Sequence, residues 1–203
     1  IGRLGYLFGN RSFLLLLAAF SICGFTTAGA VEVHFLPYAA ACGFPPFEST
    51  LAYGVLGVAN MVGMIVFGWW ADRANPRRLL AGMFFARAAS FLLFMEVAGD
   101  LPLLLIFAVV FGLLNFATLP VVATIAGRHF GVGIMGLSLG LLFGGHSLGA
   151  AAGAFAGGWL FDLFARYDWV WYLTFLLAIA AGILTLMIRP PERAMPTPVA
   201  VAA

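Results

Sequence analysis

The chain has 203 residues, of which 64% are hydrophobic and only 9% are charged, with a net charge of +2 and no lysine. A soluble protein needs enough polar surface to cover its core, and a mean hydropathy of +1.07 with 21 phenylalanines leaves too little. Composition therefore excludes an ordinary water-soluble fold, and the small net charge does not point to nucleic acid as a partner.

Long apolar blocks recur along the chain, and each is long enough to cross a bilayer as a helix. A membrane barrel would instead show short alternating runs, and only a helix satisfies all backbone groups within one segment in hydrocarbon. We therefore predict an all-α membrane protein with six transmembrane helices, over residues 12–38, 48–71, 77–97, 101–126, 132–161 and 168–188. Arg87 interrupts the third block, and we expect its long side chain to snorkel toward the lipid headgroups.

Residues 1–189 are predicted to form one six-helix domain, and the tail at 190–203, rich in Pro and Ala, is expected to be disordered on the cytoplasmic side. The chain lacks an initiator Met and a signal peptide, so we expect that Ile1 is not a natural start. Cys23 and Cys42 have neither metal-ligand nor disulfide spacing. They are expected to be inert small hydrophobes, and the sequence predicts no metal site and no cofactor.

With six spans, the arginines between the helices fall almost entirely on one side. That side carries Arg3, Arg11, Arg73, Arg77, Arg78, Arg128, Arg189 and Arg193. The opposite side carries Arg166 alone, together with Glu48, Glu96, Asp100, Asp162 and Asp168. The positive-inside rule then predicts that the arginine side and both ends of the chain are cytoplasmic.

A shift of 90 residues aligns the second predicted helix with the fifth. It pairs Gly54 with Gly144, Gly63 with Gly153, and the sequence GWWAD at 68–72 with GWLFD at 158–162. Because three helices separate the two copies, the two triplets would have opposite orientations in the membrane. Such an inverted three-plus-three repeat is typical of secondary transporters.

The loop after the second helix carries a motif of glycine, aspartate and arginines. Gly68, Asp72 and Arg73 stand in the register of the pattern Gly-x-x-x-Asp-Arg/Lys-x-Gly-Arg/Lys-Arg/Lys, and Arg77 with Arg78 supplies a basic pair displaced by one place. This loop resembles the signature of the major facilitator superfamily. We interpret these five residues as a gating latch between helices, although a plain positive-inside loop would also explain the arginines.

Two residues of this loop depart from the family pattern. Asn75 stands where the family has a second glycine, and Pro76 causes the displacement of the basic pair. Asn followed by Pro is also a good N-cap and first-turn pair, so it predicts the start of the third helix.

The resemblance covers all six spans and implies half of a major facilitator fold. The fourth helix lacks the Arg, and the fifth lacks the Gly-Pro pair, that the family's N-terminal half carries, so we expect the C-terminal half, with a missing N-terminal six-helix half as partner. The stretches at 34–46 and 144–162 are similar to bacterial members near the monocarboxylate transporters. The family resemblance implies a bacterial inner-membrane transporter that works by alternating access, and the narrower likeness implies a small organic anion as its solute. We expect proton symport to drive transport.

Glu32 and His34 lie late in the first span, and an ionisable group in hydrocarbon is a functional candidate by default. Two residues apart on a helix, they face different sides. We expect a role in substrate or proton handling, with a kink at Pro37; the alternative is that the membrane ends near Glu32.

Four further polar residues lie inside spans. Asn115 and Thr118 share a face of the fourth helix, which Pro120 can bend. In the family the first and fourth helices line the central cavity, which implies that Asn115 contacts substrate; an interhelical hydrogen bond is the alternative. Asn60 and His146 complete the predicted substrate and proton pathway, and a neutral, hydrogen-bonded His146 is the other possibility.

The fifth span carries glycines at spacing four on two faces, which predicts close helix packing. One face has Gly136, Gly140 and Gly144, and the other has Gly145, Gly149, Gly153 and Gly157. By resemblance, one of these faces meets the missing half.

Three alternative functions remain open at this stage. The sequence at 136–140 fits the hydrolase pattern G-x-S-x-G with Ser138, followed by His146, although it lies in a continuous span rather than between a strand and a helix. A half-size carrier working as a homodimer, or a membrane subunit without transport of its own, would also fit. No phosphate-binding loop supports ATP-driven export.

Overall fold

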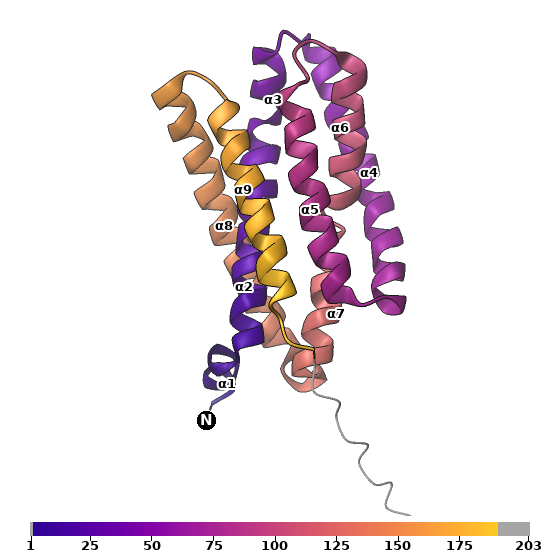
Figure 1. Cartoon of the computed structure of the whole chain (residues 1–203), viewed down its shortest axis with the longest axis vertical. Coiled ribbons are helices and arrows are strands. Elements are labelled where there is room, and N and C mark those ends of the chain that lie inside the picture. Colours follow the sequence, from indigo (N-terminus) through magenta and orange to yellow (C-terminus); the bar gives the residue numbers. More distant parts are fainter. Residues whose placement is uncertain (1, 191–203) are drawn as a thin grey trace, which may run out of the picture.

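The computed structural model describes residues 2–190, and the regular structure within that range is entirely helical. Six helical rods that are long and apolar enough to cross a membrane run up and down the molecule (Figure 1). They comprise Arg11–Ala41, Pro46–Arg73, Pro76–Met95, Leu101–Phe130, Met135–Phe164 and Asp168–Leu186. The prediction of an all-α protein with six spanning helices is confirmed. Residues 191–203, including Arg193 and most of the tail expected to be disordered, lie outside the described range.

Four of the spans are single helices, and two are interrupted. The single helices are α4 (Pro46–Arg73), α5 (Pro76–Met95), α8 (Met135–Phe164) and α9 (Asp168–Leu186). The first span consists of α2 (Arg11–Gly24), a π-helical segment η1 (Phe25–Val31) and α3 (Glu32–Ala41), and the fourth consists of α6 (Leu101–Leu114) and α7 (Thr118–Phe130). Two short pieces, α1 (Arg3–Gly9) and the 3-10 turn η2 (Val132–Ile134), lie outside the spans.

The starts of three helices are set by side-chain caps. The Asn75 Oδ1 atom accepts hydrogen bonds from the backbone amides of Arg77 and Arg78, at 3.1 and 3.3 Å, and Pro76 occupies the first turn of α5. Asn10 and Asp100 cap α2 and α6 in the same way. The predicted start of the third span is therefore confirmed, and Asn75 itself has an extended backbone (φ −76°).

The internal repeat is visible in the helix crossings. A Cβ atom on Gly63 of α4 would come within 2.2 Å of the Leu113 carbonyl oxygen on α6, and one on Gly153 of α8 would come within 2.3 Å of the Phe25 carbonyl oxygen on η1. These two glycines are the pair matched by the 90-residue shift. Only glycine permits so close a backbone approach, so the same contact is built twice.

A second pair of crossings is related in a similar way: Gly24 and Gly112 are 88 residues apart, and their partners His146 and Leu56 are 90 residues apart. A Cβ atom on Gly24 of α2 would lie 2.0 Å from the His146 carbonyl oxygen, and one on Gly112 of α6 would lie 2.6 Å from the Leu56 carbonyl oxygen. The packing of α4 on the fourth span thus repeats in the packing of α8 on the first span, while α5 packs on α9. These contacts support the inverted three-plus-three arrangement.

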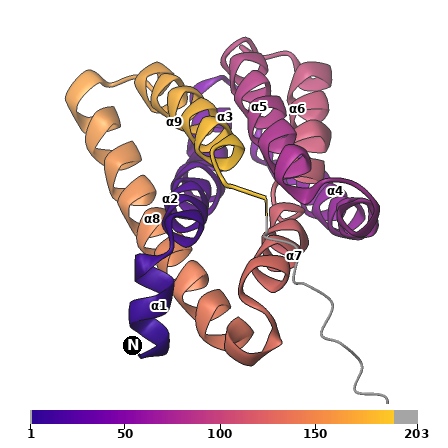
Figure 2. The same ribbon diagram turned by 60° about the horizontal axis from the view of Figure 1, so that its bottom comes forward.

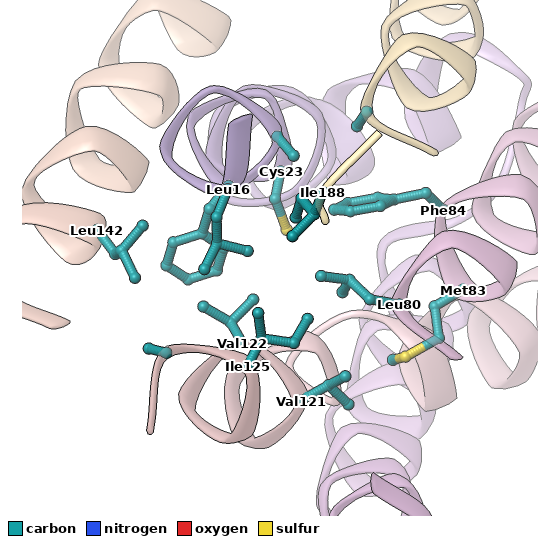
Figure 3. Packing of buried hydrophobic residues seen from close by; sticks show 14 of the residues in the cluster. Leu16, Cys23, Leu80, Met83, Phe84, Val121, Val122, Ile125, Leu142 and Ile188 are labelled. Atoms are coloured by element: carbon teal, nitrogen blue, oxygen red, sulfur yellow. The ribbon is translucent and has the colours of Figure 1, made fainter. Parts of the chain in front are cut away.

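Two hydrophobic clusters fill the interior, one in each half of the bundle's length. The first gathers residues of α2, α5 and α7, and Figure 3 shows Cys23, Phe84 and Val122 among the side chains that converge there. The second gathers aromatic residues near the other end, where Phe94 stacks on Phe107 with ring centroids 3.8 Å apart. Buried polar residues that belong to neither cluster occur where both interrupted spans lose their regular helix.

The arginine-bearing connections lie together at one end of the bundle, toward the viewer in Figure 2. There the Arg77 Nη1 atom donates to the Ile188 carbonyl oxygen at 2.6 Å, and Arg128 donates to the Ala71 carbonyl oxygen at 3.2 Å. We call this the arginine end. The acidic end is the opposite one, with the connections near Glu96, Asp100 and Asp168.

Candidate functional site

The interruption of the fourth span, at residues 115–117, leaves backbone groups without helical partners. Pro120 has no amide hydrogen, and its ring crowds the carbonyl four residues earlier, at Phe116. The Leu119 backbone amide instead donates to the Phe116 carbonyl oxygen at 3.0 Å, and the Asn115 backbone amide donates to the Gly112 carbonyl oxygen at 3.2 Å. In a membrane such freed groups must find partners within the protein. We call residues 115–117 the second interruption, and η1 the first.

Arg87 supplies the donors for the freed carbonyls of the second interruption. Its Nη2 atom donates to the carbonyl oxygens of Leu114 at 2.7 Å and Asn115 at 3.1 Å. Its Nη1 atom lies 3.1 Å from the Cys23 Sγ atom, just before the first interruption. Arg87 is fully buried. Its contacts with Cys23 and with the freed carbonyls link the two interrupted spans.

The expectation that Arg87 snorkels to the headgroups was wrong. It lies eleven residues beyond Pro76, which is about 16 Å along the helix axis. The freed carbonyls give its guanidinium inside the bundle the polar partners that headgroups or water would give it at the surface. The side chain therefore points inward.

Asn60 of α4 serves the remaining freed group. Its Oδ1 atom accepts a hydrogen bond from the Phe116 amide at 3.3 Å, and the residue is buried. Asn60 thus reaches the second interruption from α4, whereas Arg87 reaches it from α5. In this arrangement the Asn60 side-chain oxygen is occupied by the Phe116 backbone amide and does not face a cavity.

Glu32 and Asn115 are brought together across the two interrupted spans. The Asn115 Nδ2 atom donates to the Glu32 Oε1 atom at 3.2 Å. Asn115 is 2% exposed, whereas Glu32 is half-buried. The Asn115 Oδ1 atom is buried and has no hydrogen-bond partner within residues 2–190. The interhelical hydrogen bond that was the alternative for Asn115 is therefore present. Its partner, Glu32, is itself a candidate for substrate or proton handling.

The other predicted pathway residues lie on different sides of this pair. His34 faces α8, where its Nε2 atom lies 3.1 Å from the Ala154 carbonyl oxygen. Thr118 is buried toward the first span, donating to the Asn115 carbonyl oxygen with its hydroxyl 3.6 Å from the Cys23 sulfur. His146 is half-buried on α8, with its ring 4.7 Å from that of Phe20. The structure does not bring either histidine to the Glu32–Asn115 pair.

The first interruption satisfies its backbone locally. The Thr27 hydroxyl donates to the Cys23 carbonyl oxygen at 2.7 Å, and the Thr26 hydroxyl donates to the Ile22 carbonyl oxygen at 3.1 Å. The π-helical bonding of this segment keeps the remaining groups paired, and π segments within helices occur frequently at functional sites. Pro37, where a kink is expected, lies within α3, and the π-helical backbone precedes it at 25–31.

The loop motif lies at the arginine end, where it joins helices through backbone carbonyls. Gly68 lies beside the Pro120 side chain, and a Cβ atom built on it would be 3.5 Å from the proline Cβ, an ordinary contact distance. The Asp72 carbonyl oxygen accepts from Arg128, and Arg77 bonds the end of α9. Within the described residues the Asp72 carboxylate forms no ion pair.

The two remaining arginines of the motif stay at the surface near their own helices. Arg73 lies over the Trp69 ring at 4.1 Å and donates to the Trp69 carbonyl oxygen. The Arg78 side chain lines a surface cavity of about 510 Å³ between α4 and α5. Neither links two spans through its side chain.

Sequence reasoning missed Arg87 and Cys23 as members of the site. Among the arginines, Arg87 alone lay well away from both ends of a predicted span, and this depth in the helix was the signal that could have identified it. Cys23 had no such signal, because a lone cysteine in an apolar span is usually packing material. Its contact with Arg87 depends on how the first and third spans cross.

The two faces of α8 differ in what covers them. Gly149 and Gly153 press against backbone of α2 and η1, while a Cβ atom on Gly140 or Gly144 would meet nothing within 4 Å. On the repeat-related helix α4, an apolar groove of about 790 Å³ runs beside α6. Large apolar side chains are exposed on both helices, among them Val58, Met61, Ile65, Leu148, Phe155 and Trp159. The close packing predicted for the glycines is thus found on one face.

The hydrolase alternative receives no support from the geometry. Ser138 is buried at the start of α8 and donates to the Met135 carbonyl oxygen at 2.9 Å. His146 follows two turns later on the same helix, so the strand-turn-helix elbow that positions a nucleophile is not formed there. Among the described residues no group of three or more His, Cys, Asp or Glu is placed to hold a metal ion.

The family model of the Major Facilitator Superfamily matches residues 14–202. The chain belongs to this superfamily. Mouse monocarboxylate transporter 12 is 26% identical over 164 residues, which cover 79% of this chain and 34% of that protein. An uncharacterised MFS-type transporter of Bacillus subtilis, YcxA, is 26% identical over 155 residues, which cover 71% of this chain and 36% of that protein. Rat monocarboxylate transporter 13 is 27% identical over 157 residues, covering 76% of this chain and 37% of that protein.

The chain spans about a third of the length of these curated relatives. A major facilitator protein with six spanning helices is a multi-pass membrane protein of a transporter family. The weak likeness to monocarboxylate transporters stated for the sequence is confirmed, and the family indicates a transporter rather than an enzyme.

Proposed function

We propose that this chain is one six-helix half of a secondary transporter that moves a small solute by alternating access. The observation that carries the proposal is the pair of interruptions at equivalent depths of the first and fourth spans, with Glu32 hydrogen-bonded to Asn115 between them. Interrupted helices in corresponding positions of two inverted repeats are where secondary transporters bind substrate and coupling ions. Glu32, Asn115, Thr118 and Asn60 then line or support the solute site.

The partner in this proposal is a second six-helix unit, the N-terminal half of the same transporter. The exposed apolar faces of α4 and α8 support it, since these helices are related by the repeat and are the two least covered spans. A second copy of this chain could cover the same faces in a half-size homodimeric carrier. Size-exclusion chromatography with light scattering, applied to the protein at its natural length, distinguishes twelve spans in one chain from two chains of six.

The solute we propose is a small organic anion, and the coupling ion is the proton. Similarity to proteins named monocarboxylate transporters supports the anion. Glu32, His34 and His146 are the ionisable residues on the proposed pathway, and each could carry a coupling proton. The loop residues Gly68, Asp72, Arg73, Arg77 and Arg78 act as the gating latch at the arginine end.

Transport is tested with the protein at its natural length, reconstituted into liposomes. Uptake of radiolabelled carboxylates, sugars and hydrophobic drugs is measured with and without an inwardly directed proton gradient. We expect counterflow of at least one small carboxylate and its accumulation only with the gradient. Absence of both uptake and counterflow for every solute in the panel would contradict the proposal; liposomes without protein give the background.

For orientation, we propose that the arginine end faces the cytoplasm of a bacterial cell and that the acidic end faces outward. Cys42 lies at the acidic end, partly exposed, whereas Cys23 is buried. Burial raises the pKa of the Cys42 thiol above its usual value, so less thiolate is present at neutral pH and labelling should accelerate as the pH rises. A membrane-impermeant maleimide should label Cys42 in intact cells, and labelling only in inverted membranes would reverse the assignment.

A further inference from the structure

We infer that Glu32 and Asn115 form the proton-binding site of this transporter, in which the Asn115 carboxamide distinguishes the protonated carboxyl from the ionised one. The inference rests on the proposed function, because it names the coupling site within it. Of the candidates Glu32, His34 and His146, it selects Glu32. It also gives Glu32 a partner, Asn115, whose hydrogen bonds depend on whether the carboxyl group is protonated.

The inference starts from the Asn115 side-chain carboxamide, in which the nitrogen has a hydrogen-bond partner and the oxygen has none. Asn115 donates one hydrogen bond to Glu32 through Nδ2, at 3.2 Å, while its Oδ1 atom is buried without a donor within residues 2–190. A buried carbonyl oxygen without a donor is costly, and nearly all such atoms in folded proteins have a partner. The neighbourhood of Asn115 therefore lacks one hydrogen.

Protonation of Glu32 supplies that hydrogen. An ionised carboxylate only accepts hydrogen bonds, whereas the protonated acid carries one O–H donor. The nitrogen and oxygen of a carboxamide are spaced like the two oxygens of a carboxyl group, so acid and amide can join through two parallel hydrogen bonds. The same holds if the amide is reversed, because an ionised Glu32 would then face the amide oxygen and gain no bond.

The groups around Glu32 leave its charge without a cationic partner. Tyr53 of α4 lies near enough to interact with it electrostatically, and Arg87 of α5 is committed to the carbonyls of Leu114 and Asn115. On α3 itself, His34 faces α8. In the described part of the chain, the one ion pair is Arg166 with Asp168 at the acidic end. Hence no cation among the described residues is placed to neutralise Glu32, and a proton can take that role.

This pairing joins the two interrupted spans. Glu32 begins α3 directly after η1, and Asn115 begins the second interruption. With the proton bound, two hydrogen bonds hold the first span to the fourth; when the proton leaves, at most one remains beside an unpartnered amide group. Proton release therefore loosens the contact between the spans that line the proposed cavity, and Glu32 is exposed enough for water to deliver the proton.

The test measures the carboxyl group directly, so it does not depend on finding the solute. Infrared difference spectra of the reconstituted protein, at natural length, are recorded while the pH is varied. We expect a carboxylic acid C=O band that titrates in the wild type and is absent in Glu32→Gln. Asn115→Asp, nearly isosteric, should raise the midpoint of the titration by about one pH unit or more, because two carboxyl groups then share one site. Asn115→Leu should shift the band to higher frequency, because the acid carbonyl loses its hydrogen bond.

The matched control is Glu96→Gln, which removes an exposed carboxyl at the acidic end and should leave the assigned band in place. Monodisperse elution of each variant in detergent shows that it is folded. The inference is overturned if Glu32→Gln retains the titrating band, or if both Asn115 variants leave the frequency and the midpoint unchanged.

A transport measurement separates this inference from the proposed function. If the wild type accumulates solute in a proton gradient, Glu32→Gln should lose this accumulation, whereas the control Glu96→Gln should keep it. Accumulation that survives in Glu32→Gln but disappears in His146→Gln would overturn the assignment of the proton site and leave the transporter proposal intact. If the wild type neither takes up nor exchanges any solute, the transporter proposal fails, whereas the infrared result still decides whether Glu32 and Asn115 share a proton.

Discussion

The two interruptions occupy equivalent places in the repeat, but their backbone groups are satisfied in different ways. Thr27 in the first interruption and Asn115 in the second are 88 residues apart, the same offset that relates Gly24 to Gly112 at the helix crossings. The first interruption stays helical with π-type bonding and uses hydroxyls of its own turn. The second opens the helix and depends on Arg87 and Asn60 from two other spans.

This difference indicates that the first interruption is stabilised by local hydrogen bonds, whereas the second is stabilised by tertiary contacts with other spans. A π segment carries its hydrogen bonds along the chain, so it can form in any environment that favours a helix. The second interruption cannot form in hydrocarbon until α4 and α5 bring their polar side chains to it. The two halves of the repeat should therefore respond unequally to mutations at matching depths.

The largest effect is expected for Arg87→Met, which removes the donors of two freed carbonyls. The Leu114 carbonyl is left without a donor, at a cost of about 1–3 kcal/mol, and the Asn115 carbonyl keeps only the Thr118 hydroxyl, at a cost of about 1 kcal/mol more. The free energy of unfolding should therefore fall by about 2–4 kcal/mol. Arg87→Lys should fall in between, because an ammonium group can reach one carbonyl. Equilibrium unfolding in mixed micelles with increasing SDS measures the change.

The control for Arg87 is Arg73→Met, since Arg73 is exposed and contacts only its own helix. Its effect should be within about 0.5 kcal/mol. Equal stability of the two methionine variants would show that the second interruption does not need a tertiary donor.

The second-largest effect is expected at the glycine helix crossings, which are alike in the two halves of the repeat. Gly63→Ala and Gly153→Ala each place a methyl group on a backbone carbonyl of the crossing helix, and each should lower the unfolding free energy by about 1–3 kcal/mol. Gly54→Ala and Gly144→Ala are the controls, because nothing lies within 4 Å there, and they should gain up to about 1 kcal/mol from helix propensity. A tolerated Gly63→Ala beside a damaging Gly153→Ala would break the equivalence of the two crossings.

Features that depend on local chemistry could be predicted from the sequence. The apolar blocks identified six spans because hydrocarbon admits little else than helices. Asn75 followed by Pro76 identified the start of α5, since a cap needs only the first turn of its own helix. The glycine spacing on α8 predicted close helix packing, which is found on one of its two glycine faces.

Features that depend on crossings between spans could not be predicted in the same way. Arg87 and Asn60 appear in the sequence as isolated polar residues of different helices, and nothing along the chain says that both reach residues 114–116. Glu32 and Asn115 were both candidates, and the family resemblance placed their spans beside one cavity. The hydrogen bond between them, however, depends on the depth at which the two spans cross.

A third, smaller effect is expected for Asn60→Leu. The variant leaves the Phe116 amide without its acceptor, and because that hydrogen bond is long, at 3.3 Å, the loss should be about 1 kcal/mol. Asn60→Asp keeps an acceptor and serves as the control for shape. Thermal unfolding in detergent, followed by the monodisperse fraction, compares the two. A stability of Asn60→Leu above that of the wild type would mean that the Phe116 amide finds another partner.

The smallest effect is expected at the first interruption, for Thr27→Val. The hydroxyl donates to the Cys23 carbonyl oxygen from within the same helical segment, and such bonds from Thr to the preceding turn bend helices without stabilising them much. Valine removes the donor and the acceptor of the side chain together, so no hydroxyl is left unpaired, and the change should be less than about 1 kcal/mol. A loss as large as that of Arg87→Met would show that the first interruption also depends on a side chain, and the contrast between a local and a tertiary irregularity would fail.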